Sequence, residues 1–202
     1  MTDWIEGIES AWTGHRVFAE WLVGITMSSV IVDLGVDAGY SSFVFANALK
    51  NTGLVSGTVY GVDLFTGDNH TGSRDTYTRV VNYKNTHDMT NFEIIKDDFT
   101  SLSNKWTIPI DILHIDGYHT EEAVSNDYNN WNRFVKDNGI ILFHDVCIPY
   151  FGVKDFFRKL DHGYKLYFTH SAGLGIVTKN KMLYDSIINN FNNVYDFNKN
   201  PF

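Results

Sequence analysis

Two short segments carry the residues whose types and spacing are best suited to chemistry. Asp116 and His119 lie three positions apart in a turn that follows an apolar run, and His144 and Asp145 follow the next such run. Two carboxylates brought close together repel unless one is protonated or a cation lies between them, and oxygen ligands of this kind suit Mg²⁺. We therefore expect Asp116 and Asp145 to hold a divalent metal. His119 is suited to act as a general base, because the pKa of histidine lies near neutrality.

Each of these residues has a simpler explanation when it is considered singly. An aspartate at a strand end is often a helix cap, and a histidine in a turn is often only solvated. His144 fits a role as a third metal ligand, as a group that orients a ligand, or as a substrate contact. His114 is expected to alternate away from the site and to lie in the core. The recurrence of acid and histidine after two successive apolar runs nevertheless favours a functional site.

A second group of candidate residues surrounds a turn that contains glycine. Gly35 and Gly39 lie in the segment Asp33-Leu-Gly-Val-Asp-Ala-Gly39, where glycine permits a tight turn and close approach of a ligand to the backbone. Asp63 ends the next apolar run, where an acid can accept hydrogen bonds from both hydroxyls of a ribose. Asp98 follows a third run and is suited either to an adenine amino group or to helix capping. The glycine spacing differs from G-x-G-x-x-G, which weighs against a nicotinamide dinucleotide site.

These residues need strands and helices that bring them to one place. Short apolar runs predict seven strands, at 30–34, 58–63, 92–96, 110–115, 140–143, 165–169 and 174–178. Helical spacing predicts helices at 15–25, 41–50, 120–135 and 150–160. This alternation is typical of an α/β fold with a doubly wound, mainly parallel seven-stranded sheet, and the short link between the last two runs adds an antiparallel C-terminal hairpin. Ligands of such sheets bind at the carboxyl ends of the strands, where the candidate residues lie.

The turn at Asp33–Gly39, together with Val62-Asp63 and Lys96-Asp-Asp98-Phe99, resembles the class I S-adenosylmethionine-dependent methyltransferases over about residues 15–178. In that family the turn holds the methionine part of the cofactor, the acid after the second strand holds the ribose, and the acid after the third lies near adenine. The resemblance implies a Rossmann-like methyltransferase fold. It also implies that the cofactor contacts Asp33, Gly35, Gly39, Tyr40, Ser41, Asp63, Asp98 and Phe99.

The segment 114–119, with Asp127, Trp131 and the Phe143-His-Asp145 run, resembles a narrower subgroup that includes the macrocin-type sugar O-methyltransferases. That resemblance implies Mg²⁺ bound by the two strand-end acids, Asp116 and Asp145, and the histidine of the turn, His119, as the base. This chain departs from the commonest pattern at Tyr118, where the subgroup usually has a second aspartate. It is also shorter than the sugar enzymes.

The loop after the second predicted strand contains a further resemblance to that subgroup. Asp68 and His70 match its Gly-Asp-x-His segment. Their position beside the cofactor suits binding of substrate hydroxyls or closure over the cofactor. An ordinary surface loop is the alternative explanation.

The composition bounds the partners and the compartment. Acids outnumber bases 24 to 16, a net charge of −8, which argues against nucleic acid or an anionic membrane as the main partner because phosphate contacts need clustered Lys and Arg. The single cysteine, Cys147, allows no intramolecular disulfide and favours a reducing compartment. We expect a cytoplasmic protein with one methyltransferase domain over 1–202. Its expected parts are an N-terminal helical cap at 1–28, a core at 29–178, and a C-terminal helix and tail at 179–202.

The leading functional expectation is metal-assisted methyl transfer from S-adenosylmethionine to a hydroxyl of a sugar or another small polyol. Three alternatives remain open: a non-catalytic module that binds cofactor or metal, a nicotinamide oxidoreductase, and a metal-dependent hydrolase. The hydrolase would use the same four side chains but would leave the glycine turn and Asp63 without a role. A homo-oligomer is compatible with the sequence, because a short enzyme without a lid domain can borrow a loop from its neighbour.

Overall fold

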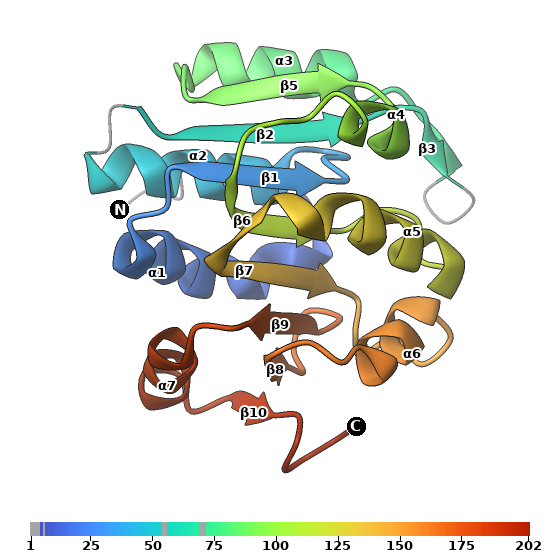
Figure 1. Cartoon of the computed structure of the whole chain (residues 1–202). Helices are drawn as coiled ribbons and strands as arrows, with labels where there is room; N and C mark the ends of the chain where they lie inside the picture. Colours follow the sequence, from blue (N-terminus) through green and yellow to red (C-terminus); the bar gives the residue numbers. More distant parts are fainter. Residues whose placement is uncertain (1–4, 6, 54–55, 69–71) are drawn as a thin grey trace.

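A sheet of eight strands forms the centre of the part of the chain that the computed structural model describes, residues 5, 7–53, 56–68 and 72–202 (Figure 1). The strands of this sheet are β1 (Val30–Leu34), β2 (Thr58–Asp63), β5 (Phe92–Lys96), β6 (Ile110–Ile115), β7 (Val135–His144), β8 (Tyr164–Phe168), β9 (Leu174–Thr178) and β10 (Val194–Asp196). Their order is β10-β8-β9-β7-β6-β1-β2-β5. β1, β2, β5, β6 and β7 are parallel, whereas β9 is antiparallel to β7 and β8, and β10 is antiparallel to β8.

This architecture confirms the α/β, mainly parallel Rossmann-like fold with antiparallel C-terminal strands. The number of strands needs a small correction, because the described sheet has eight strands and the sequence predicts seven. The eighth strand, β10, lies in the segment 179–202 that was predicted as a helix and tail. Its three residues pair with Leu166–Phe168 of β8. A strand this short carries no periodic pattern, so its conformation is decided by its partner strand rather than by its own sequence.

Helices cover both faces of the sheet. They are η1 (Ala11–His15), α1 (Arg16–Thr26), α2 (Tyr40–Thr52), α3 (Tyr77–Thr86), α4 (Phe99–Ser103), α5 (Glu121–Trp131), η2 (Asn132–Phe134), α6 (Gly152–Lys159) and α7 (Lys181–Asn190). One hydrophobic core joins α1, α2, α3 and α7 to the sheet, and the other joins α5 and α6 to the opposite face. Within the described residues, no helix is long and apolar enough to span a bilayer.

The alternation of side chains along each strand explains this three-layer arrangement. Successive residues of a strand point to opposite faces, so Ile31 and Ile112 enter the core beneath α1 and α2, whereas their neighbours Val32 and Leu113 enter the core beneath α5 and α6. The parallel strands are therefore apolar on both faces. Because their carboxyl ends meet at one edge, the polar residues that follow the strands gather there.

The junction between α5 and β7 differs from the prediction. The helix expected at 120–135 ends at Trp131, and β7 begins at Val135 rather than at 140. Ile110 pairs with Val135 but Ile112 pairs with Ile140, so β7 carries extra residues that bulge from the ladder. Bulges commonly contain glycine, and Gly139 lies in this one. The Asp137-Asn-Gly139 segment therefore interrupts the register of the strand without ending it.

A small two-stranded sheet lies in the loop after β2. It pairs β3 (Gly67–Asp68) with β4 (Gly72–Ser73) in antiparallel fashion. Asp68 is thus placed at the tip of a hairpin in the backbone. His70, the other substrate residue predicted in this loop, lies outside the described residues.

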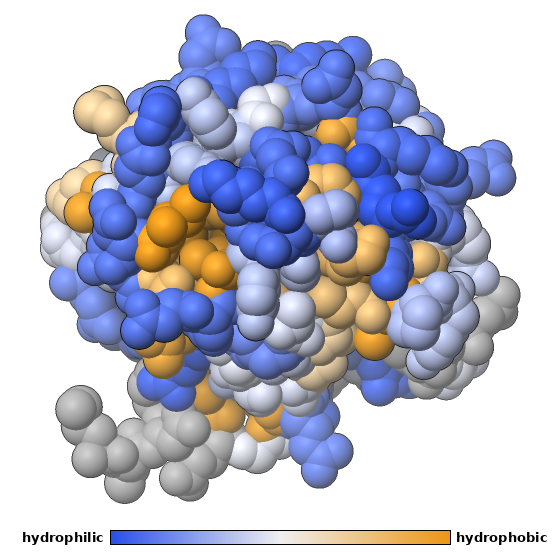
Figure 2. All heavy atoms as spheres, turned by 90° about the horizontal axis from the view of Figure 1, so that it is seen from below, coloured by the Kyte–Doolittle hydropathy of each residue, from blue (hydrophilic) through white to orange (hydrophobic). Residues whose placement is uncertain are grey.

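The edge of the sheet at β10 has a mixed surface. Viewed from below, which is the side of β10 and α7 in Figure 1, apolar side chains form separate patches among hydrophilic ones (Figure 2). Met182 and Ile188 of α7 and Tyr195 of β10 are among the exposed apolar side chains. β10 itself covers part of the otherwise open side of β8.

Candidate functional site

A cavity of about 600 Å³ opens at the carboxyl ends of the parallel strands. Most of the residues that the sequence predicted for cofactor and metal line this one cavity: Gly35, Asp63, Asp98, Phe99, Asp116, His119, His144 and Asp145. They come from the ends of β1, β2, β5, β6 and β7. The placement follows the general rule that ligands of doubly wound sheets bind outside the carboxyl ends of the strands.

Gly35 connects the turn after β1 to the end of β6. Its φ is +100°, and a Cβ at this position would overlap the carbonyl oxygen of Asp116. The amide of Gly35 donates to the carbonyl of Val62 (3.0 Å), and the amide of Asp116 donates to the carbonyl of Leu34 (2.8 Å). Only glycine allows the three strand ends to approach this closely. The turn after β1 and Asp116, the acid that follows β6, are therefore held in one rigid arrangement.

Asp63 is held by two backbone amides at the end of β2. Its Oδ2 accepts from the amide of Asp37 (2.8 Å), and its Oδ1 accepts from the amide of Phe65 (2.6 Å). Burial raises the pKa of Asp63, although these two hydrogen bonds oppose the change. Asp37 in turn forms an ion pair with Arg74 (2.5 Å), which also lines the cavity. The carboxylate of Asp63 is thus fixed where the sequence predicts contact with a ribose.

Asp33, by contrast, lies behind the turn and does not line the cavity. It is fully buried, and its Oδ2 accepts from the hydroxyls of Ser41 (2.7 Å) and Ser42 (2.5 Å). Its Oδ1 lies 2.6 Å from Nδ1 of His114, and the indole N–H of Trp12 donates to Nε2 of the same ring (3.0 Å). Because the indole only donates, His114 carries its proton on Nδ1 and donates to Asp33. This network joins η1, β1, β6 and the start of α2.

Three other residues predicted for the cofactor share this placement. Gly39, Tyr40 and Ser41 begin α2 and do not line the cavity.

Asp98 lines the cavity and also caps α4, since its Oδ1 accepts from the amide of Ser101 (2.9 Å). Both roles considered for Asp98 are therefore compatible with its position. His114 is fully buried, which confirms its predicted place in the core.

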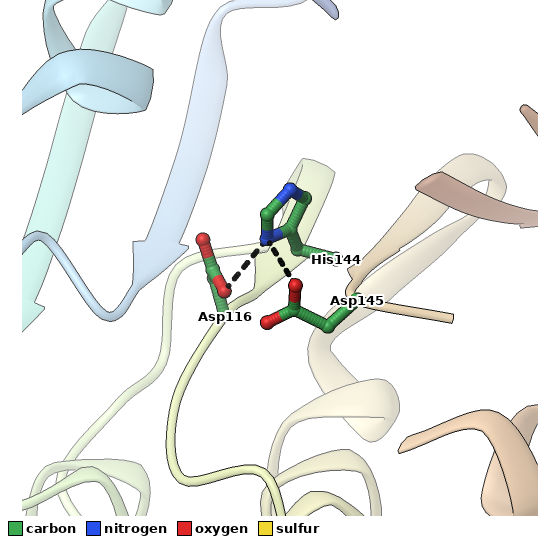
Figure 3. A group of neighbouring side chains, drawn as sticks. All are labelled: Asp116, His144 and Asp145. Carbon is green, nitrogen blue, oxygen red and sulfur yellow. Dashed lines mark hydrogen bonds and ion pairs between the residues drawn. The ribbon is translucent and has the colours of Figure 1, made fainter. Parts of the chain in front are cut away.

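Asp116, His144 and Asp145 converge at the ends of β6 and β7 (Figure 3). Nδ1 of His144 lies 3.2 Å from Oδ1 of Asp116 and 3.3 Å from Oδ1 of Asp145. One potential ligand atom from each residue lies within 4.8 Å of the others. Asp145 adopts a left-handed backbone conformation (φ 63°), which is uncommon for a residue other than glycine and turns its carboxylate back toward His144.

The charges of this cluster are strongly coupled. Burial alone would lower the pKa of His144, but Asp116 and Asp145 raise it well above its ordinary value. Burial likewise opposes ionisation of Asp145, but hydrogen bonds with His119 and His144 outweigh burial and hold its pKa well below the usual range. The two carboxylates therefore create a position that favours positive charge.

The orientation of His144 depends on the loop between β8 and β9. Nε2 of His144 lies 3.0 Å from the carbonyl oxygen of Ser171, and Nε2 of His15 lies 3.1 Å from the same oxygen. A carbonyl only accepts, so both rings carry a proton on Nε2. Burial and the neighbouring histidines His144 and His170 lower the pKa of His15 to about 3, so His15 is neutral. No sequence pattern indicates this role of Ser171, because the two histidines contact its backbone carbonyl.

His119 faces Asp145 from the turn after β6. Its Nε2 lies 2.8 Å from Oδ2 of Asp145, and its ring stacks on Phe151 with centroids 4.2 Å apart and planes 8° from parallel. Phe151 immediately precedes α6.

A second buried acid, Asp127 of α5, also lines the cavity. In the sequence, Asp127 is part of the resemblance to the macrocin-type subgroup, but no role is predicted for it.

Comparison with known proteins defines the class of this chain. Residues 32–146, more than half of the 202 residues, match the family described as a methyltransferase domain. The chain belongs to this family, and its fold and strand-end cavity are those of a class I S-adenosylmethionine-dependent methyltransferase.

The chain is also similar to a curated protein, Uncharacterized protein y4gI of Sinorhizobium fredii (strain NBRC 101917 / NGR234). The two are 30% identical over 174 residues, which is 83% of this chain and 19% of that protein. The chain thus spans about a fifth of the length of this curated relative.

Solved structures share the fold at low sequence identity. A putative caffeoyl-CoA O-methyltransferase from Staphylococcus aureus has a TM-score of 0.64 and 15% identity, covering 82% of each chain. An O-methyltransferase from Bacillus cereus, solved in complex with SAH, has a TM-score of 0.62 and 14% identity, covering 87% of this chain and 84% of that one. An rRNA methylase from Streptococcus thermophilus has a TM-score of 0.59 and 15% identity, covering 85% and 98%. At these identities, the likeness establishes the fold.

Proposed function

We propose that this chain transfers a methyl group from S-adenosylmethionine to a hydroxyl of a sugar or another small polyol, assisted by a divalent metal such as Mg²⁺. The observation that carries the proposal is the convergence of Asp116, His144 and Asp145 in the same cavity as Gly35 and Asp63. A cofactor held at the ends of β1 and β2 would direct its methyl group toward the ends of β6 and β7, where these three residues lie.

The donor atoms of this cluster fit a divalent cation. Two carboxylates are the hard oxygen ligands that Mg²⁺ prefers. Nε2 of His144 donates to the Ser171 carbonyl, so Nδ1, once it releases its proton to make way for the cation, would present a lone pair. The pKa of His144 is raised because Asp116 and Asp145 favour a positive charge beside them. A divalent cation would provide that positive charge equally well. When bound there, a divalent ion would lower the pKa of an acceptor hydroxyl.

We propose His119 as the general base. Its ring is held flat against Phe151, and Asp145 lies 2.8 Å from its Nε2. Because Nε2–H donates to the Asp145 carboxylate, the proton of the acceptor hydroxyl would be taken by the other ring nitrogen, Nδ1, and the carboxylate would stabilise the imidazolium that forms. A positioned base of this kind contributes roughly 10²–10⁴-fold to a rate. Alignment of the oxygen, methyl carbon and sulfur supplies further acceleration.

The charge of the cavity supports an uncharged acceptor. Among the described residues, its lining has one Lys or Arg, Arg74, which is paired with Asp37. The lining carboxylates are Glu9, Asp37, Asp63, Asp98, Asp116, Asp127 and Asp145. Two of the structural neighbours are named for caffeoyl-CoA and rRNA, which both bear phosphates. An acceptor of that kind would be repelled here, whereas a neutral polyol and the positive sulfonium of the cofactor would not.

Methyl transfer to a panel of sugars and polyols, measured with Mg²⁺ and with EDTA, tests the proposal. Asp116→Asn and Asp145→Asn are each expected to lower metal-dependent transfer by about 100-fold or more, because each removes a charged ligand. Both variants should bind S-adenosylhomocysteine nearly as the wild type does. Asp155→Asn is the matched control, since Asp155 is an exposed acid of α6 that does not line the cavity.

Two results would count against this assignment. Full activity of both variants in EDTA would remove the metal from the mechanism. Tight binding of S-adenosylhomocysteine with no transfer to any acceptor would favour a non-catalytic cofactor-binding module instead.

A further inference from the structure

Asp127 is a buried acid with no use in the chemistry described above. Its exposed fraction is 6%, yet its side chain lines the large cavity. Within the described part of the chain, no hydrogen bond or ion pair reaches its carboxyl group. Burial, and to a smaller extent the charge of Asp98, raises the pKa of Asp127 to about 7. A largely buried carboxyl that opens onto a cavity and has no protein partner is available to a ligand that enters the cavity.

Gly117 lies beside both Asp127 and the ring of Phe99, and all three line the cavity. A Cβ at Gly117 would lie 2.8 Å from Phe99 Cε2 and 3.1 Å from Asp127 Oδ2. The glycine therefore avoids crowding both side chains, and the ring of Phe99 forms a wall of the cavity close to the acid. Such a wall suits a flat aromatic ligand.

Several other acids of the cavity have partners. Asp63 accepts two backbone amides, one oxygen of Asp98 caps α4, and Asp116 faces His144. Among the described residues, neither oxygen of Asp127 has a hydrogen-bond partner, and its carboxyl lies close to Phe99 beside Gly117. A ligand that enters this part of the cavity therefore meets an acid that is available to bind it.

A carboxyl group that carries its proton offers one donor and one acceptor side by side. A side-chain amide offers the same pair, and Asn or Gln uses it to bind adenine through the amino group and the adjacent ring nitrogen. Building on the proposed cofactor, we propose that Asp127 selects the adenine of S-adenosylmethionine. Its carboxyl O–H donates to a ring nitrogen next to the amino group, and its carbonyl oxygen accepts from that amino group.

Calorimetric binding of S-adenosylhomocysteine and three analogues to the full chain tests this role. The analogues lack the exocyclic amine, N1 or N7. The wild type should bind the parent about 10- to 100-fold more tightly than the analogue without the amine and one of the two analogues without a ring nitrogen. Asp127→Asn should keep these ratios, because the amide offers the same donor and acceptor. Asp127→Leu should bring the ratios close to one.

Glu122→Gln is the matched control, because it removes an acid from the same helix at a position that does not line the cavity. Its ratios should equal those of the wild type. If Asp127→Leu keeps the wild-type ratios, or if the wild type itself does not distinguish the analogues, Asp127 does not select adenine. That second result needs no variant to fold. A wild type that fails to bind S-adenosylhomocysteine would instead refute the proposed cofactor, and this inference with it.

Discussion

Individual ionisable residues in this cavity differ sharply in the charge that their surroundings favour. Asp145 is held ionised by His119 and His144, whereas burial and the charge of Asp98 raise the pKa of Asp127, in the same cavity, to about 7. His15 is kept neutral by burial among other histidines. Groups whose surroundings separate their pKa values in this way are typical of functional sites.

The raised pKa of Asp127 predicts a dependence of stability on pH. The folded protein holds this proton up to about pH 7, whereas the unfolded chain releases it near 3.8. Stability is therefore lost as the pH rises between these values and stays reduced above pH 7. Asp127→Asn should remove the loss, so its unfolding free energy should rise relative to the wild type between pH 4 and pH 8, by at most about 4 kcal/mol.

Denaturant unfolding of both proteins at the two pH values measures this difference. The Glu122→Gln variant should show no comparable change between pH 4 and pH 8. A difference between Asp127→Asn and the wild type that is the same at pH 4 and pH 8 would show that Asp127 ionises normally.

At the scale of elements, the structure separates residues that bind from residues that hold the binding turn in place. The network of Asp33, His114 and Trp12 fixes η1 and the start of α2 against β1 and β6. Every polar atom that faces the Asp33 carboxylate donates to it, so the buried charge is well satisfied. Asp63, in contrast, has its carboxylate in the cavity.

Asp33→Asn is therefore expected to act on stability more than on binding. The amide would place an N–H against donors that now point at a carboxylate, at a cost of about 2–3 kcal/mol in unfolding free energy. Far below the melting temperature, the Kd for S-adenosylhomocysteine should change less than in Asp63→Asn. The reverse order, with Asp33→Asn the weaker binder of equal stability, would place Asp33 in contact with the cofactor.

The sequence predicts elements whose own pattern decides their conformation. The strands at 30–34, 58–63, 92–96, 110–115 and 174–178 coincide with β1, β2, β5, β6 and β9, because each run contains enough apolar β-branched or aromatic residues to indicate a strand by itself. The start of β7 and the whole of β10 depend on pairing with β6 and β8, which a local pattern does not contain. The same reason explains Asp33: its position near the end of a strand was visible, but the histidine that engages it lies 81 residues away.

At the scale of the whole molecule, distant parts of the chain converge on the candidate metal site. The Ser171 carbonyl meets His144 from β7 and His15 from η1, and Gly14 bonds to the same loop through the Ser171 hydroxyl (3.1 Å). Ser171, Ala172 and Gly173 all have positive φ values, which aim that carbonyl inward. The orientation of His144, one of the proposed metal ligands, thus depends on both the N-terminal and the C-terminal parts of the chain.

The short strand β10 has a consequence for the behaviour of the molecule in solution. An open strand edge is a template for pairing with another chain, and short edge strands limit this hazard. Removing residues 194–202 would expose β8, whose residues include Leu166, Tyr167 and Phe168. We expect the shortened chain to scatter light and to precipitate at concentrations where the full chain does not. Equal solubility of the two would show that residues 194–202 are dispensable; otherwise, this short segment, with β10 at the margin of the sheet, protects the protein from aggregation.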